Sequence, residues 1–223
     1  MTGMTKRLQF IAILLILLFC SPASRAASME TLKDYKTAFI QAVQNSTVAD
    51  SEVTRLVNEG IMEVATVLKC IHKKDTLVTT SGNSDYAVNS DLIIGGIFAV
   101  ELKKDGMRNG LDSLPHSLIG EKFESSGDPN SYSVWGQIIT IHPEGTAEPC
   151  TLIVKYASEP DYVDEDADIV QLPNEYAWLA VMYAQIRHYQ NLLMFSQAAA
   201  LQNAFDAAVD RKYLKLWGVR RAQ

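Results

Sequence analysis

Histidine and cysteine are the side chains best suited to metal binding and nucleophilic chemistry. Their spacing in this chain predicts neither a metal site nor a nucleophilic site. The sequence contains no HxH, HExxH or CxxC pattern, and it lacks the GxSxG, GxGxxG and GxxxxGK[ST] motifs of hydrolase and nucleotide sites. The four histidines are His72, His116, His142 and His188. The sequence therefore predicts no catalytic residue, no metal and no cofactor, and a protein that is not an enzyme.

The acidic stretch DYVDEDAD, residues 161–168, is the pattern that comes nearest to a calcium loop. Its alternating carboxylates, with the glutamate that stands where the last calcium ligand would lie, are Asp164, Asp166, Asp168 and Glu175. Ile169 occupies the position where the sharp turn needs glycine, and Pro173 stiffens the exit from the loop. We interpret the stretch as a solvated acidic loop that leads into a helix N-terminus, where negative charge is favourable.

The C-terminal segment RKYLKLWGVRRAQ is basic in a chain whose net charge is −6. Its mixture of cations with large apolar groups suits docking onto an acidic protein partner, and it would also suit contact with a membrane or nucleic acid. The simpler interpretation is that the cations complement the C-terminal end of a helix dipole. We predict a partner-binding segment that is poorly ordered alone and orders on binding, with these residues: Arg211, Lys212, Leu214, Lys215, Leu216, Trp217, Arg220 and Arg221.

The first 28 residues have the layout of a secretory signal peptide. Lys6 and Arg7 precede an unbroken apolar run over 10–20, and the pattern Ser24, Arg25, Ala26 predicts cleavage after Ala26. The run is too short to span a bilayer as a helix. The alternative is that translation begins at Met29 and that residues 1–28 are a misassigned extension. On either hypothesis the segment lies outside the fold, and the mature chain has no membrane segment.

Helical spacing of apolar residues predicts two helices before residue 75, one over 31–44 and one from Asp50 or Ser51 to about His72. The apolar stripe of the second helix is Val53, Leu56, Val57, Gly60, Ile61, Val64, Leu68 and Ile71. A third helix opens at 172–175, and a fourth covers 198–216. The expected buried face of the third is Trp178, Leu179, Met182, Tyr183, Ile186, Tyr189 and Leu193. We expect the stripe to face Trp178, Met182 and Ile186.

Between these helical parts the pattern changes to short β-branched and aromatic segments bounded by turn residues. Strands are predicted at TLVTT (76–80), YAV (86–88), IFAVELKKDG (97–106), QIITIHP (137–143) and TLIVKYA (151–157), forming a small antiparallel sheet. The fold class is α+β, a bundle of N- and C-terminal helices with an inserted antiparallel β-rich subdomain. We expect one domain over 29–223, helical over 29–74 and 172–223 and β-rich over 75–171. Whether Cys70 and Cys150 pair depends on the compartment and stays open.

The order of these features resembles the adaptor, or head-to-tail connector, proteins of the neck of tailed bacteriophages. The resemblance covers Met29 to about Tyr213. It is carried most specifically by GDPNSYSVWGQIITIHPEG (127–145) and by the helix opening in IVQLPNEYAWLAVMYAQ (169–185), with EVTRLVNEGIMEVA and TLIVKYASEP beside them. These are structural positions and not a catalytic signature.

The resemblance implies a structural virion protein assembled in the host cytoplasm. Its copies, twelve in number, would form a ring that joins the portal to the tail or head-closure protein and extends the DNA channel without binding DNA specifically. It also implies that the C-terminal segment docks into the portal. The alternative is an exported periplasmic or surface binding module of the bacterial envelope. The first residue of the mature protein separates them, because Ala27 favours export and Met29 the virion.

Overall fold

The computed structural model describes residues 28–44, 47–115, 127–143 and 149–218. The chain forms two compact units, which we call the helical unit and the β unit. The helical unit contains the residues up to Val64 and those from Asp161 onward, and the β unit is Ala65–Pro160. The insert that the sequence places at 75–171 thus compares with a compact unit at 65–160. Helices from both ends of the chain flank a β-rich region, which confirms the α+β class.

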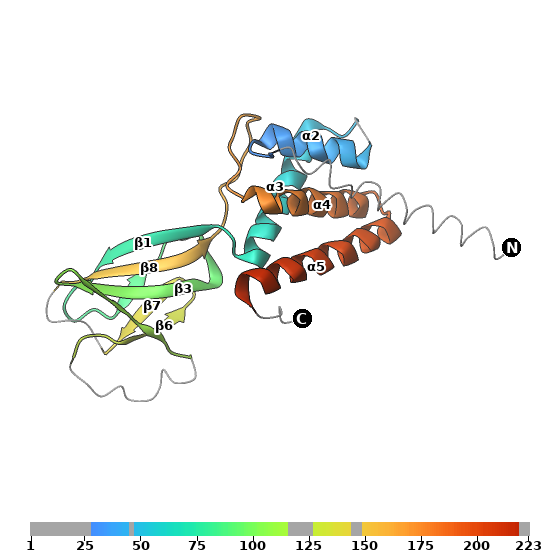
Figure 1. Cartoon of the computed structure of the whole chain (residues 1–223). Coiled ribbons are helices and arrows are strands. Elements are labelled where there is room, and N and C mark those ends of the chain that lie inside the picture. The colour runs from blue at the N-terminus through green and yellow to red at the C-terminus, as the bar shows by residue number, and fades with distance from the viewer. Residues whose placement is uncertain (1–27, 45–46, 116–126, 144–148, 219–223) are drawn as a thin grey trace. The chain divides into compact units, whose positions relative to one another are not determined.

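Four described helices build the helical part: α2 (Leu32–Val43), α3 (Asp50–Leu68), α4 (Asn174–Asn191) and α5 (Phe195–Trp217) (Figure 1). Thr31 and Asp34 form a capping box at the start of α2, and the backbone N–H groups that the carboxylate accepts hold the pKa of Asp34 below its usual value. The α3 helix ends at Leu68 because Lys69 adopts a left-handed conformation, with φ of 50°. The predicted end near His72 was therefore wrong, and His72 begins a strand.

The stripe on α3 is buried as predicted, and Ile71 is buried just beyond the helix. The buried face of α4 differs from the prediction. It is made largely of small residues, and its members are Tyr176, Ala177, Leu179, Ala180, Val181, Ala184, Ile186 and His188. Trp178 and Met182 are only half-buried, and Leu193 lies beyond the helix with 73 % of its surface exposed.

Gly60 explains which side of α4 faces α3. A Cβ atom placed on Gly60 would lie 2.1 Å from the carbonyl oxygen of Ala180, so the two backbones meet there. Trp178 and Met182 are each two positions from Ala180, and about 200° around a helix separates such positions. The expectation that the α3 stripe faces Trp178 and Met182 was therefore wrong, because backbone contact requires the alanine side of α4.

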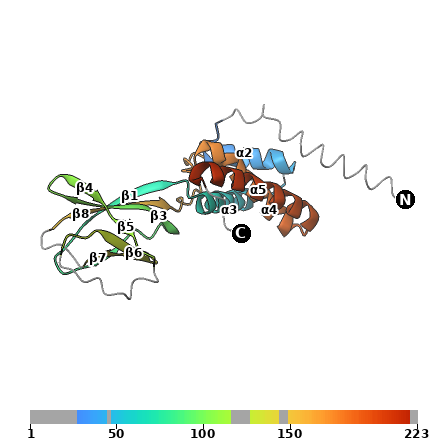
Figure 2. The same cartoon turned by 60° about the horizontal axis from the view of Figure 1, so that its bottom comes forward.

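The β unit contains two four-stranded sheets packed face to face, where the sequence predicted one (Figures 1 and 2). The first sheet has the order β1 (His72–Val78), β8 (Thr151–Ser158), β3 (Leu92–Lys104), β4 (Met107–Gly110). The second has the order β2 (Asp85–Ala87), β7 (Ile138–His142), β6 (Ser131–Trp135), β5 (Asp112–Ser113). All pairs are antiparallel except β5 with β6.

Alternating residues of both sheets point inward and form the core of the β unit. Its largest fully buried side chains are Ile139, Ile141, Leu152 and Tyr156. Cys150 is buried at the start of β8, and Cys70 is half-buried; the structure forms no disulfide between these two residues.

Candidate partner-binding surfaces

The C-terminal segment singled out in the sequence is helical through Trp217 and forms the last two turns of α5. The expectation that it orders only on binding is therefore wrong for residues 211–217. Arg220 and Arg221 lie outside the described residues. Gly218 ends the helix in a left-handed conformation and donates its N–H to the carbonyl of Leu214.

Lys212 is part of the contact between α5 and α4. Its Nζ atom lies 3.4 Å from Oε2 of Glu175 and 5.2 Å from the centre of the Tyr176 ring. Arg211 donates to the carbonyl oxygen of Ala207. Lys212 therefore stabilises the helix pair.

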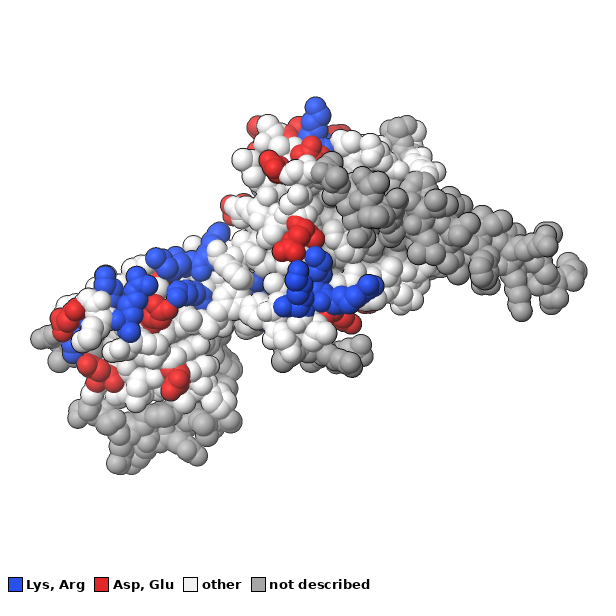
Figure 3. Space-filling view, in the orientation of Figure 1, with Lys and Arg blue, Asp and Glu red and all other residues white. Residues whose placement is uncertain are grey.

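The outward part of this segment combines cations with apolar side chains. Leu214 and Leu216 are exposed over 46 % and 42 % of their surfaces, and Arg211 and Lys215 are exposed beside them. Trp217 is half-buried, with its ring 6.3 Å from that of Tyr213. The residues up to Trp217 are already helical, so this helix end needs no folding step before it could bind a partner. In Figure 3 the cations of α5 form a compact group.

A second exposed surface of the helical unit was not found from the sequence. Residues 192–195 join α4 to α5 and present four large apolar side chains in succession: Leu192, Leu193, Met194 and Phe195. Phe195 is 62 % exposed. We call these residues the apolar corner. The run LLMF in the sequence could have revealed this surface. Helical periodicity instead predicted that Leu193 is buried, because apolar spacing alone does not show where α4 ends.

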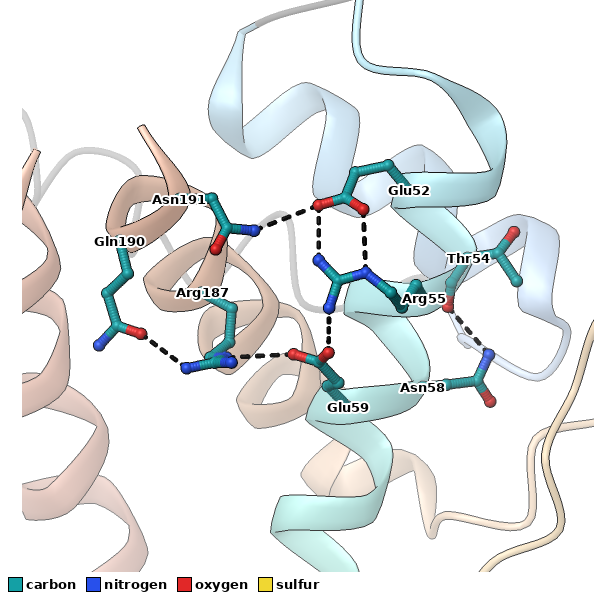
Figure 4. Close-up of polar contacts among 8 residues, drawn as sticks. All are labelled: Glu52, Thr54, Arg55, Asn58, Glu59, Arg187, Gln190 and Asn191. Atoms are coloured by element: carbon teal, nitrogen blue, oxygen red, sulfur yellow. Dashed lines mark hydrogen bonds and ion pairs between the residues drawn. The ribbon is translucent and has the colours of Figure 1, made fainter. Parts of the chain in front are cut away.

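A polar network joins α3 to α4 next to the apolar corner (Figure 4). Arg55 binds Glu52 through two nitrogens, at 2.6 and 2.9 Å, and also pairs with Glu59. Glu59 in turn accepts from Nε of Arg187 at 3.1 Å, and Asn191 donates to Glu52 at 3.2 Å. The hydrogen bonds from Arg55 hold the pKa of Glu52 below its usual value. The network fixes the last turn of α4, on which the apolar corner rests.

His188 makes the stability of the helical unit depend on pH. Its ring is buried between those of Phe39 and Tyr189, each with its centre 5.7 Å away, and this burial lowers its pKa while Glu52 opposes the shift. Because the folded-state pKa lies below the unfolded value of about 6.5, the stabilisation is full above that pH and is lost as pH falls below it. Urea unfolding at pH 7.5 and 5.5 should show a larger loss for the wild type than for His188→Gln.

An equal loss in the two proteins would contradict the role of His188. The hydrogen bonds that lower the pKa values of Asp34 and Glu52 keep these carboxylates charged between pH 7.5 and 5.5, so neither group accounts for a loss in that range.

The β unit exposes an apolar ladder on the second sheet. Trp135 pairs with Ile138 across the β6–β7 hairpin, and Ile138 pairs with Ala87 of β2. Trp135 is 66 % exposed and Ile138 is 43 % exposed. Gly136, with φ of 61°, allows the tight two-residue turn between them. A large indole on a rigid hairpin is a typical anchor of a protein interface.

The residues considered first for chemistry have structural contacts. The carboxylate of Asp168 accepts the backbone N–H groups of Asp164 and Glu165, and Asp166 pairs with Lys36 at 2.8 Å. Nε2 of His142 lies 3.0 Å from Oγ of Ser133 and ties β7 to β6. His116 lies outside the described residues. Among the residues described, no group of three or more metal-binding side chains is brought together.

The signal-like segment lies outside the described residues. In the part of the chain that the structure describes, no helix has the length and apolar character needed to cross a membrane.

Comparison with known proteins identifies the family. The family model of the SU10 adaptor protein matches residues 30–222, a range that takes in all of the β unit and every described helix of the helical unit. A search of the curated proteins finds no match. The resemblance to phage adaptors, inferred from the order of helices and strands, is confirmed by this match. The chain belongs to the SU10 adaptor protein family, a family of structural head–tail adaptors of bacteriophages.

Proposed function

We propose that this adaptor forms a ring in the phage neck that joins the portal to the tail and extends the DNA channel. The observation that carries the proposal is the family match over both units. It is supported by exposed apolar surfaces on each unit, at the end of α5 and the apolar corner on one, and at the Trp135 hairpin on the other. Joining two partners requires two such surfaces and no catalytic group.

The helical unit is the proposed portal-binding part. Its α5 segment offers Leu214, Leu216 and Trp217 as apolar anchors, with Arg211 and Lys215 as cations around them. The β unit would then receive the tail or head-closure protein through the Trp135 hairpin. We infer twelve copies in the ring, the number that the resemblance implies, and assembly in the host cytoplasm. A net charge of −6 suits a channel that DNA crosses without adhering.

Removing the end of α5 should weaken binding to the portal. A chain truncated after Tyr213 loses the exposed Leu214 and Leu216 together with Trp217, and we expect the affinity to fall about 100-fold, because apolar anchors dominate interface energies. Leu214→Ala with Leu216→Ala should give about a tenfold faster dissociation with little change in folding, since both side chains are already exposed. Sedimentation with the cognate portal and surface plasmon resonance measure these effects.

Met107→Ala is the matched control, because Met107 is 69 % exposed and lies on β4 of the other unit. It should bind the portal as the wild type does. If truncation after Tyr213 leaves portal binding unchanged, the docking role moves to the rest of the helical unit, where the apolar corner is the next candidate. If the intact chain forms no portal complex by sedimentation or electron microscopy, the proposed function is wrong.

A further inference from the structure

The outer face of the first sheet of the β unit is strongly basic. Strand register places Lys74 opposite Lys155 and Lys103 opposite Arg108. The same register puts all four on the face that points away from the core, together with Glu101. We call these five residues the basic face; its formal charge is +3, four cations and one carboxylate. Figure 3 shows lysine and arginine side chains gathered over the strands of this sheet.

Two pairs of like charges opposite one another are costly in a sheet. Glu101 relieves part of the cost, because Lys155 pairs with its Oε1 and Arg108 lies 3.8 Å from its Oε2. The hydrogen bond from Lys155 holds the pKa of Glu101 below its usual value, so the carboxylate is charged at neutral pH. Lys74 and Lys103 are exposed and form no ion pair with a described residue. The basic face therefore has charge left for an anionic partner.

The same chain carries a surface of opposite sign on its helical unit. Five of the eight residues at 161–168 are acidic, and we call this stretch the acidic segment. Asp164 and Glu165 are exposed, and neither carboxylate forms an ion pair with a described residue. Tyr162 beside them is 67 % exposed. The segment therefore presents two carboxylates and an aromatic ring, which is a mixture that lysine and arginine bind well.

The backbone of the acidic segment is held in place by contacts within the helical unit. Asn58 binds both the N–H and the carbonyl of Val163, at 3.0 and 2.7 Å. Residues 32 and 33 donate their N–H groups to the carbonyl oxygens of Asp168 and Asp166. Lys36 pairs with Asp166 and, at 2.5 Å, with Asp50. A segment fixed in this way loses little entropy when it binds.

We propose that the basic face of one copy binds the acidic segment of the next copy. This inference rests on the proposed ring and specifies its subunit contact. A contact between two different surfaces of the same chain is heterologous, and repetition of it closes a ring when the rotation allows. Charge favours a second copy over nucleic acid as the partner of the basic face. The net charge of −6 repels the phosphates of nucleic acid, whereas a second copy offers its acidic segment as a complementary surface.

Crosslinking between labelled and unlabelled copies tests the contact directly. The full chain, mixed as ¹⁴N and ¹⁵N protein at about 20 mM salt, is treated with a carbodiimide, which joins amines to carboxylates in contact. We expect mixed-isotope crosslinks from Lys74 or Lys155 to Asp164 or Glu165, and their loss at about 500 mM salt, where charges are screened. Crosslinks found only within one copy, or a chain that stays monomeric at low salt, would overturn the proposal.

Two neutralised variants test the direction of the contact. Lys74→Gln with Lys155→Gln removes charge from the basic face, and Asp164→Asn with Glu165→Gln removes it from the acidic segment. Each variant alone should self-associate at least about tenfold more weakly than the wild type. A mixture of the two should form a 1:1 dimer and no larger species, because each supplies one intact surface. Analytical ultracentrifugation measures both results.

The control is Asp105→Asn with Asp112→Asn, which neutralises two exposed carboxylates of the β unit. This variant should associate as the wild type does, since it changes the net charge but alters no residue of the basic face or the acidic segment. If duplex DNA binds the wild type but not Lys74→Gln with Lys155→Gln, and self-association is equal in both, the basic face serves nucleic acid and the proposal is wrong.

Different results would refute the proposed subunit contact and the proposed role in joining the portal to the tail. The neutralised variants keep the α5 segment, so single copies of them should still bind the portal while failing to close a ring. Variants that close normal rings on the portal would refute the subunit contact alone. Head-to-tail association of the wild type without any portal complex would refute the proposed function alone.

Discussion

Replacing Gly60 with alanine should destabilise the helical unit by about 3 kcal/mol, although alanine is the better helix former by about 1 kcal/mol. The added methyl carbon would lie 2.1 Å from the carbonyl oxygen of Ala180 and 2.9 Å from its carbonyl carbon. Both atoms belong to the backbone of α4, so no side chain can rotate away. The helices must separate, and the buried side chains around the crossing must lose contacts. Urea unfolding followed by circular dichroism at 222 nm measures the change.

Gly110→Ala and Gly127→Ala are the controls for this prediction. A Cβ atom at either position would meet nothing within 4 Å, and neither residue has a positive φ. Both substitutions should change the free energy of unfolding by less than about 0.5 kcal/mol. If Gly60→Ala is as mild as these controls, α3 and α4 do not touch through their backbones at this crossing.

The helices could be predicted from the sequence because their apolar spacing is a local signal. The α3 stripe is the clearest case, and its predicted members are buried. The side of α4 that faces α3 could not be predicted in the same way. The prediction placed Trp178 on the face toward α3 because large aromatic residues are usually buried. At the point where α3 and α4 approach most closely, the residue on α4 is Ala180, because a contact between backbones needs small side chains on both helices.

The candidate surfaces also differ in whether a local sequence pattern reveals them. The C-terminal segment stands out in the sequence because its charge and its Trp217 are contiguous. The basic face does not, since Lys74 and Lys155 lie far apart in sequence and meet only through the pairing of β1 with β8. Register between distant strands depends on tertiary packing, and no local pattern specifies it. The role of Lys212 in the α4–α5 contact was hidden for the same reason.

Leu56→Ala should lower the free energy of unfolding of the helical unit by about 2–5 kcal/mol, because a fully buried leucine leaves a cavity that close packing cannot fill. Leu56 lies one turn before Gly60 on the same face of α3, so the backbone contact at Gly60 holds the helix in place and limits its collapse into the space. Met62→Ala on the same helix is the matched control, since Met62 is 37 % exposed and should cost less than about 1 kcal/mol. Urea unfolding of the three proteins gives the comparison. Equal losses for Leu56→Ala and Met62→Ala would show that the stripe is not the core of the helical unit.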